Sequence, residues 1–165
     1  MAQDTQIICP EIDVCREISP SLIKHVLVPF DESEISYHAF EFALDLAKKY
    51  HAKLSIITII HSNILASSFL QVSSHQKIIE RKKVSELNHL FKIIESIAKR
   101  FGVQAYTDIV LSGNVSDSIV SFCSQQKVNL IVMGTRSRTG PRKYLIGSVA
   151  VDVLQKASCP VVFVK

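Results

Sequence analysis

Short apolar runs alternate with longer helical repeats along most of the chain. The runs cover residues 25–30, 54–60, 103–111, 129–133 and 161–164, and the second is almost uninterrupted and rich in Ile and Thr. Strands that are buried on both faces of a parallel sheet have this pattern. The third run contains Gln104, Thr107 and Asp108, so we expect its strand to be less completely buried.

Between these runs, apolar residues recur three or four positions apart, as on one face of an amphipathic helix. The first helix is predicted to begin within residues 31–34, and the longest spans residues 76–101 and ends at Gly102. A third follows the turn at 112–114, with Ile119, Val120 and Cys123 facing inward, and the last spans 144–156. The inward stripe expected for the first helix is Ile35, Ala39, Phe42, Ala43, Leu46, Ala47 and Tyr50. The stripe expected for the longest helix is Leu87, Leu90, Phe91, Ile94, Ile97, Ala98 and Phe101.

This alternation predicts the α/β fold class, with an open, doubly wound five-stranded parallel sheet and helices on both faces, as in Rossmann-like folds. Residues 1–22 are predicted to be an N-terminal extension, because they are acidic and interrupted by Pro10 and Pro20, and residues 23–165 to form one domain. Apolar residues of the extension either pack on the domain or pair as an edge strand. The last strand would leave a backbone edge exposed unless another strand pairs with it.

Composition narrows the class of protein. A 165-residue chain with 47% hydrophobic and 21% charged residues is typical of a globular domain. No apolar run approaches the ~18 residues of a membrane helix, and no secretory signal is expected at the N-terminus. The four cysteines lack zinc-site spacing and suit a reducing compartment, so we expect a cytoplasmic protein without membrane contact. Cys9 and Cys15 either form a redox pair or, as we favour, are two free thiols.

Residues 130–150 carry the candidate chemistry. An apolar run stops at Gly134, a basic loop follows, and Gly147 and Ser148 open the last helix. Glycine allows close backbone approach, and a helix start presents free N–H groups that attract an anion. The simpler alternatives are a strand-exit turn at Gly134 and a plain helix cap at Ser148. The basic residues of the loop, with no interleaved aromatic row, do not predict nucleic-acid binding; they are Arg136, Arg138, Arg142 and Lys143.

The spacing of these residues resembles the nucleotide-binding signature of the universal stress protein family, G-x-x-G-x9-G-[S/T]. Gly134, Gly147 and Ser148 match it, while Ser137 stands where the second glycine is expected. The segments LVPFDESE and SCPVVFVK are similar to the first and last strands of the family, so the resemblance covers residues 22–165. Neither G-x-x-x-x-G-K-[S/T] nor G-x-G-x-x-G occurs in the chain.

The resemblance implies a homodimer that pairs its last strands and binds ATP or AMP, with or without Mg. Pro29 and Ile59 would line the nucleoside pocket and Asp31 would bind the ribose or adenine, unless Asp31 merely caps the first helix. The expected cofactor-binding residues are Pro29, Asp31, Ile59, Met133, Gly134, Ser137, Gly147, Ser148 and Val149. Because serine seldom adopts φ > 0, Ser137 predicts a different loop path, weaker binding or a smaller ligand, although its hydroxyl is also a potential phosphate donor.

The function expected from these residues is a regulatory adenine-nucleotide-binding protein of the stress response. Two alternatives stay open: slow ATP hydrolysis at the same loop, and a dimeric interaction module with a vestigial pocket. The six histidines lack metal-site spacing and no nucleophile motif is present, so the sequence predicts no catalytic residue and no metal ligand.

Overall fold

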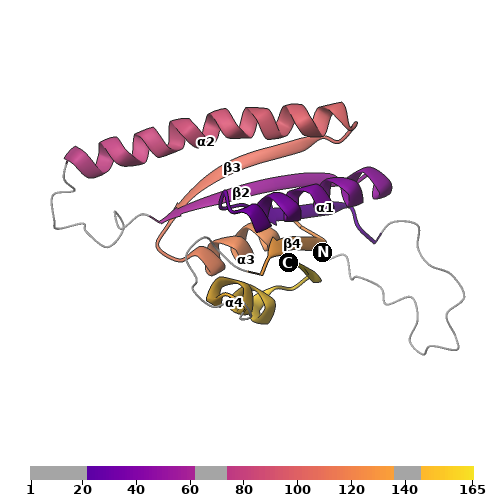
Figure 1. The fold of residues 1–165 in the computed structure, drawn as a ribbon. Helices are drawn as coiled ribbons and strands as arrows, with labels where there is room; N and C mark the ends of the chain where they lie inside the picture. The colour runs from indigo at the N-terminus through magenta and orange to yellow at the C-terminus, as the bar shows by residue number, and fades with distance from the viewer. Residues whose placement is uncertain (1–21, 62–73, 136–145) are drawn as a thin grey trace, which may run out of the picture.

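Strands and helices alternate strictly in the structure, a computed structural model that describes residues 22–61, 74–135 and 146–165 (Figure 1). The described strands are β1 (His25–Pro29), β2 (Lys53–His61), β3 (Ala105–Ser112), β4 (Leu130–Gly134) and β5 (Val161–Val164). The described helices are α1 (Glu34–Tyr50), α2 (Ser74–Arg100), α3 (Val115–Gln125) and α4 (Ser148–Lys156). All strand pairs are parallel, in the order β3-β2-β1-β4-β5, which confirms the predicted doubly wound fold.

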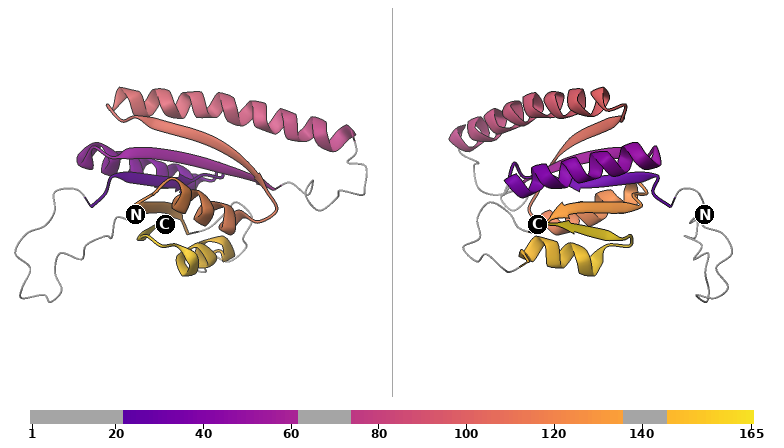
Figure 2. Two further views of the ribbon diagram at one scale, coloured as in Figure 1. Left: turned by 180° about the vertical axis from the view of Figure 1, so that it is seen from behind. Right: turned by 45° about the vertical axis from the view of Figure 1, so that its right-hand side comes forward.

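The central strand β1 is buried on both faces. Val26, Leu27 and Val28 each have 0% of their surface exposed, although neighbouring side chains of a strand point to opposite faces. Val26 and Val28 pack in a cluster with α1 and α2, while Leu27 packs in a second cluster with α3 and α4. The views in Figure 2 show these two helix pairs on opposite sides of the sheet.

The two edge strands differ from the centre. β3 alternates between partly buried and exposed residues, with Tyr106 and Leu111 exposed, which confirms its predicted incomplete burial. All four residues of β5 are partly buried. β5 pairs with β4 on one side only among the described residues, so its other backbone edge is available.

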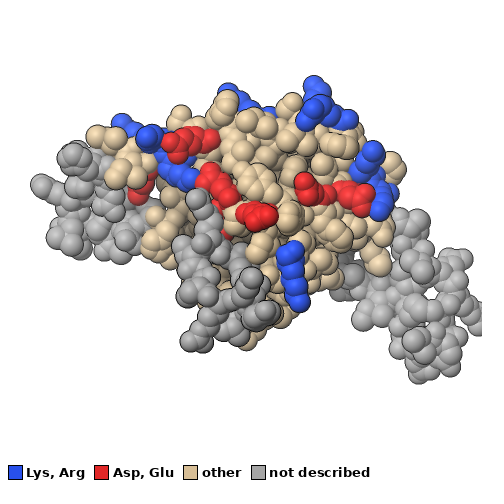
Figure 3. Space-filling model, viewed as in Figure 1, with Lys and Arg blue, Asp and Glu red and all other residues tan. Residues whose placement is uncertain are grey.

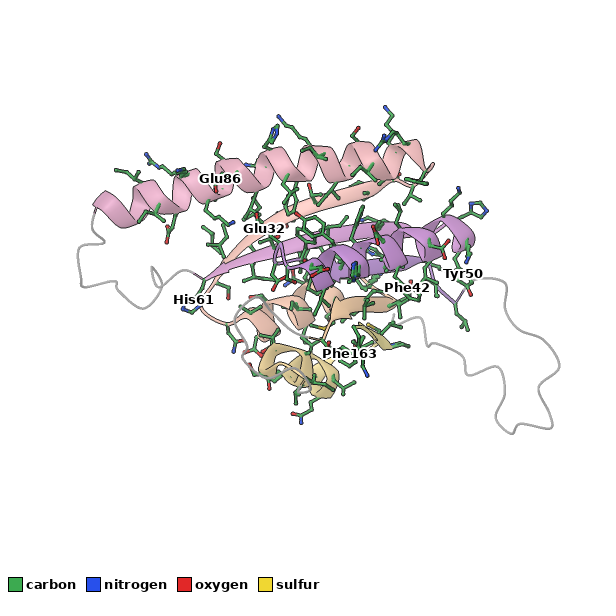
Figure 4. The ribbon with its side chains drawn as sticks, viewed as in Figure 1. Glu32, Phe42, Tyr50, His61, Glu86 and Phe163 are labelled. Carbon is green, nitrogen blue, oxygen red and sulfur yellow. The ribbon has the colours of Figure 1, made fainter. Side chains whose placement is uncertain are left out.

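The inward face of α1 is rotated relative to the prediction. Ala39, Ala43 and Ala47 are buried as expected, but Phe42 and Tyr50 are 44% and 46% exposed, so their assignment to the core was wrong. Figure 4 labels both side chains on this helix. The row that replaces them in the core consists of Ser36, Phe40 and Leu44. Phe40 and Leu44 share a cluster with Phe91 and Ile94 of α2, so packing against α2 decides which flank of the alanine row is buried.

The helix ends also refine the prediction. α1 begins at Glu34, the last position of the predicted range, so Asp31 and Glu32 precede the helix. α2 ends before Gly102, whose φ of +77° permits the expected turn. Phe101 lies beyond α2 and is exposed, with Lys48 Nζ 5.7 Å from its ring centroid, so its predicted core position was wrong.

His25 is a buried residue with partners for both ring nitrogens. Nδ1 lies 3.1 Å from the Gln126 carbonyl oxygen and Nε2 lies 2.8 Å from Ser55 Oγ. Because a carbonyl only accepts, Nδ1 carries the proton and Nε2 accepts from the serine hydroxyl. Burial lowers the pKa of His25 below 6.5, opposed by the Gln126 hydrogen bond and assisted by the charge of Lys53.

We predict that His25 makes the stability of the protein fall on acidification. Because its pKa is lower in the folded chain than in the unfolded chain, the unfolded state binds the proton first as the pH drops. The stabilisation is complete above about pH 6.5, the ordinary histidine pKa, and is lost as the pH falls through the folded-state pKa. Urea unfolding between pH 7.5 and 5.5 measures this slope. His25→Gln should flatten it, whereas His89→Gln on the exposed side of α2 should not; equal slopes in all three proteins would contradict the assignment.

Candidate functional site

The candidate site lies where the winding of the sheet reverses, between β1 and β4. From β1 the chain proceeds outward to β2 and β3, and then returns to β4 and β5 on the other side of β1. At such a reversal the connections that follow the two strands run to opposite faces of the sheet, which leaves a crevice beyond the carboxyl ends of the strands. Leu27 pairs with Ile131, and four residues further along each strand lie Asp31 and Thr135. The register therefore brings these two residues to the same edge of the sheet, just beyond two neighbouring strands.

The exit of β1 is held rigidly by β2. The Phe30 N–H donates to the Ile57 carbonyl at 2.8 Å, and the buried Thr58 hydroxyl donates to the Phe30 carbonyl at 2.8 Å. The Phe30 ring also meets Tyr37 of α1 edge-on, with centroids 5.0 Å apart. These contacts fix the backbone that carries Asp31.

Asp31 holds the residue that caps α1 rather than capping the helix itself. Its Oδ1 accepts from Ser33 N at 3.1 Å and from Ser33 Oγ at 2.6 Å. Ser33 is the N-cap, and its Oγ accepts from Ser36 N at 3.2 Å. The alternative that Asp31 itself caps the helix was therefore wrong, because the cap is Ser33. The carboxylate is half-buried and oriented through one oxygen.

Glu32 is a feature of this edge that the sequence prediction missed. Its φ is +61°, a left-handed conformation that costs a residue with a Cβ roughly 1 kcal/mol. Its carboxylate accepts from Lys83 Nζ of α2 at 2.5 Å, and Figure 4 labels Glu32 between the ribbons of α1 and α2. Glutamate seldom marks a left-handed turn, so no local signal identified it.

The exit of β4 contains a buried hydroxyl, that of Thr135, for which the described residues offer no hydrogen-bond partner. Thr135 is 4% exposed, its N–H donates to the Val164 carbonyl at 3.0 Å, and its carbonyl accepts from Gly147 N at 2.8 Å. Its Oγ1 has no hydrogen-bond partner among the described residues. A buried hydroxyl left without a partner costs about 1–3 kcal/mol, so a polar ligand atom at this position would be stabilised. The residues here thus fit a ligand that bears oxygen or nitrogen atoms.

The start of α4 faces the same edge. Gly147 is the N-cap, with φ −65° and ψ 153° and no side-chain cap, and Ser148 is the first helical residue. The alternative that Ser148 is the cap was therefore wrong. The predicted start of the helix at residue 144 was also wrong, because Ile146 and Gly147 lie outside the helix. The Gly147 N–H already donates to Thr135, which leaves the N–H groups of Ser148, Val149 and Ala150 at the helix end.

The remaining residues that were expected to bind the cofactor differ in where they lie. Pro29 ends β1 opposite Ile57, and Gly134 ends β4 opposite Val164. The side chains of Ile59 and Met133 pack on the cluster of α3 and α4, with Met133 buried, so the core explains both side chains. Ser137 and the four basic loop residues lie outside the described residues.

Comparisons with known proteins agree with this architecture. The sequence profile of the Universal stress protein family matches residues 22–165. The chain belongs to the universal stress protein family. A universal stress protein of Methanocaldococcus jannaschii is 32% identical over 145 residues, which cover 88% of this chain and 84% of the relative.

Solved structures of the family share its fold. The universal stress protein UspA from Lactobacillus plantarum superposes with a TM-score of 0.76 at 18% identity, over 86% of this chain and 97% of its own. The universal stress protein from Archaeoglobus fulgidus in complex with dAMP gives a TM-score of 0.59 at 21% identity, over 87% of this chain and 98% of its own.

Other described surfaces of this universal stress protein offer little to compete with the strand ends as a ligand site. Across residues 22–61, 74–135 and 146–165, no three His, Cys, Asp or Glu side chains are grouped to hold a metal. No helix in these ranges is long and apolar enough to cross a membrane. Acidic and basic side chains are interspersed over the face that carries α1 and α2 (Figure 3).

A groove of about 410 Å³ lies between α1 and the C-terminal part of α2. Its lining is mostly aromatic and aliphatic, with three charged residues at its border: Tyr37, Phe40, Glu41, Leu44, Asp45, Lys48, Ile97 and Phe101. The groove belongs to the helix–helix contact, and none of the predicted site residues lines it.

We predict that Ser33→Ala destabilises the protein by about 1 kcal/mol, the usual contribution of an N-cap. The melting temperature should fall by about 2–4 °C for a domain of this size. Ser121→Ala, which removes an exposed hydroxyl from α3, is the matched control and should change it by less than about 1 °C. Differential scanning calorimetry makes the comparison; equal melting temperatures would contradict the capping role of Ser33.

Proposed function

We propose that this universal stress protein binds an adenine nucleotide, ATP or AMP, in the crevice beyond β1 and β4, and that it acts as a cytoplasmic, homodimeric regulator in the stress response. The observation that carries the proposal is the placement of Asp31 and Thr135 after neighbouring strands at the reversal point, with the start of α4 bonded to Thr135 through the Gly147 N–H. The Thr135 hydroxyl has no hydrogen-bond partner among the described residues. The related protein from Archaeoglobus fulgidus, solved with dAMP, supports the ligand class.

Asp31 is suited to the nucleoside. Ser33 holds Oδ1 through two hydrogen bonds, which sets the plane of the carboxylate. Oδ2 then accepts from a ribose hydroxyl or an adenine amine, both of which are donors. Since the carboxylate is already oriented, binding costs little additional side-chain entropy.

The exit of β4 and the start of α4 are suited to the phosphates. The N–H groups of Ser148 and Val149 begin a helix of nine residues, and the helix dipole favours an anion there. The Ser148 side chain is exposed at this end, and the preceding residue, Gly147, donates its N–H to the Thr135 carbonyl. The Gly147 N–H is engaged with Thr135, so fewer backbone donors serve the phosphates than the sequence pattern suggests.

We predict that variants of the nucleoside half and of the phosphate half of the site change the affinities for ATP, AMP and adenosine differently. Asp31→Asn should weaken all three ligands, because all carry the nucleoside. Thr135→Val should weaken ATP by roughly tenfold or more, since one hydrogen bond to a charged oxygen contributes about 1.5–3 kcal/mol. The same variant should be as stable as the wild type or more so, because it removes an unpartnered buried hydroxyl.

Two further variants, at Ser137 and Gly147, test the phosphate half of the proposed site. Ser137→Gly should tighten ATP more than adenosine, because it restores backbone freedom beside the phosphates. Gly147→Val should abolish ATP binding without unfolding the protein, because its side chain would obstruct the phosphates. Isothermal titration calorimetry measures each affinity, and the release of phosphate from ATP would reveal slow hydrolysis. If none of the ligands binds wild type or variants, the pocket is vestigial and the chain is an interaction module.

We predict a homodimer that pairs β5 with the β5 of a second copy. The Pro160 carbonyl accepts from Ile131 of β4, and the Val164 carbonyl accepts from Thr135, the residue after β4. The alternate residues Val161 and Phe163 therefore direct their backbone groups to the open edge. Phe163→Pro removes an outward N–H, which an edge strand tolerates, and should give a monomer. Phe163→Ala loses the same side chain but keeps the N–H, and should stay dimeric.

Multi-angle light scattering at micromolar concentration reports the mass of each protein. A monomer mass for the wild type would refute the dimer. Equal dimer fractions for Phe163→Pro and Phe163→Ala would place the interface elsewhere.

A further inference from the structure

Two cysteine thiols lie in contact at the end of the sheet opposite the nucleotide crevice. Cys123 Sγ and Cys159 Sγ are 3.2 Å apart, and the residues are 36 positions apart in the sequence. Cys123 lies near the end of α3, and Cys159 lies in the turn between α4 and β5. Since α3 runs back from the carboxyl edge of the sheet and β5 begins at the amino edge, the pair belongs to the amino edge.

We propose that Cys159 and Cys123 form a peroxide-reactive dithiol, in which Cys159 is the attacking thiol, Cys123 is the resolving thiol, and a hydroperoxide is the oxidant. The assignment of roles follows from burial: Cys123 is 2% exposed and Cys159 is only partly buried, so a small oxidant reaches Cys159 first. The proposal is independent of nucleotide binding, because the two sites occupy opposite edges of the sheet.

The surroundings of the two sulfur atoms support these roles. The thiol hydrogen bond from Cys123, assisted by the backbone N–H of Ile131, lowers the pKa of Cys159 against the opposing effect of burial. The same hydrogen bond, followed by burial, raises the pKa of Cys123. Of the two sulfur atoms, the more accessible one is therefore the one that ionises more readily, and the thiolate is the reactive form of cysteine.

The chemistry balances with a hydroperoxide as the only co-reactant. The Cys159 thiolate attacks one peroxide oxygen, the S–O bond forms as the O–O bond breaks, and the leaving alkoxide or hydroxide takes a proton from solvent. Oxygen on Cys159 removes the charge that held the proton on Cys123. Cys123 then attacks Cys159 Sγ, the S–S bond forms, and the hydroxyl leaves as water with the Cys123 proton. Two thiols are oxidised and one peroxide is reduced.

The sequence makes the test unambiguous, because trypsin separates the cysteines. Cleavage after Arg16, Arg100, Lys127 and Lys156 places Cys9 and Cys15 in peptide 1–16, Cys123 in peptide 101–127 and Cys159 in peptide 157–165. The reduced full-length protein is treated with equimolar hydrogen peroxide, blocked with N-ethylmaleimide and digested without reductant. We expect mass spectrometry to show peptides 101–127 and 157–165 linked, with the loss of two hydrogen atoms.

Variants then separate the two roles. In Cys123→Ala the Cys159 sulfenic acid should persist and be captured by dimedone on peptide 157–165. In Cys159→Ala no dimedone adduct should form on peptide 101–127. The combined Cys9→Ser, Cys15→Ser protein is the matched control and should form the link as the wild type does. The alkylation rate of Cys159 should also reach its midpoint at a higher pH in Cys123→Ala, because the hydrogen bond is lost.

Oxidation should also be visible in stability. A link across this span should raise the melting temperature by about 10 °C, because it restricts the unfolded chain. ATP affinity should stay unchanged, which keeps this result distinct from that of the nucleotide proposal. Peroxide that oxidises peptide 1–16 first, or that leaves both Cys123 and Cys159 as alkylated thiols, would overturn the proposal.

Discussion

The burial of β1 and β4 beside each other is the constraint on which the structure depends. Both strands must be covered on two faces, so helices pack above and below them, and the chain winds outward in both directions. This reversal separates the loops at the carboxyl ends of the two strands. Asp31 and Thr135 lie there because the core requires Val28 and Met133 to be buried just before them. The position of the proposed ligand site is thus a consequence of how the core is covered.

Polar groups at this edge are held by one another as well as by the sheet. Ser33 caps α1 and orients Asp31, and Thr135 receives the Gly147 N–H that precedes α4. Each functional position is therefore coupled to a helix start. The opposite edge of the sheet carries a different chemistry, in which the end of α3 and the entry to β5 bring two thiols into contact. The core lies between the two edges, so the proposed nucleotide site and the thiol pair can act independently.

Much of the fold was predictable because short apolar runs in the sequence identify the buried strands. A run such as Leu54–Ile57 is typical of a strand that is buried on both faces of a sheet. Gly102 indicates a turn because glycine readily adopts a positive φ. Phe42 was misplaced because the alanine row of α1 has apolar residues on both flanks, and only α2 decides between them. Glu32 and the contact of Cys123 with Cys159 depend on tertiary placement, which residue spacing does not encode. The position of Ser148 after the cap, rather than at it, was beyond sequence patterns for the same reason.

The central claim, that the reversal between β1 and β4 binds an adenine nucleotide, is tested most directly by two-dimensional ¹H–¹⁵N NMR of the protein titrated with AMP. The account predicts that the amide signals of residues 31–33, 134–135 and 148–150 shift together with one saturation curve. Signals that line the groove between α1 and α2, such as those of Leu44 and Ile97, should stay in place. Shifts confined to that groove, or no saturable shift at the strand ends, would contradict it.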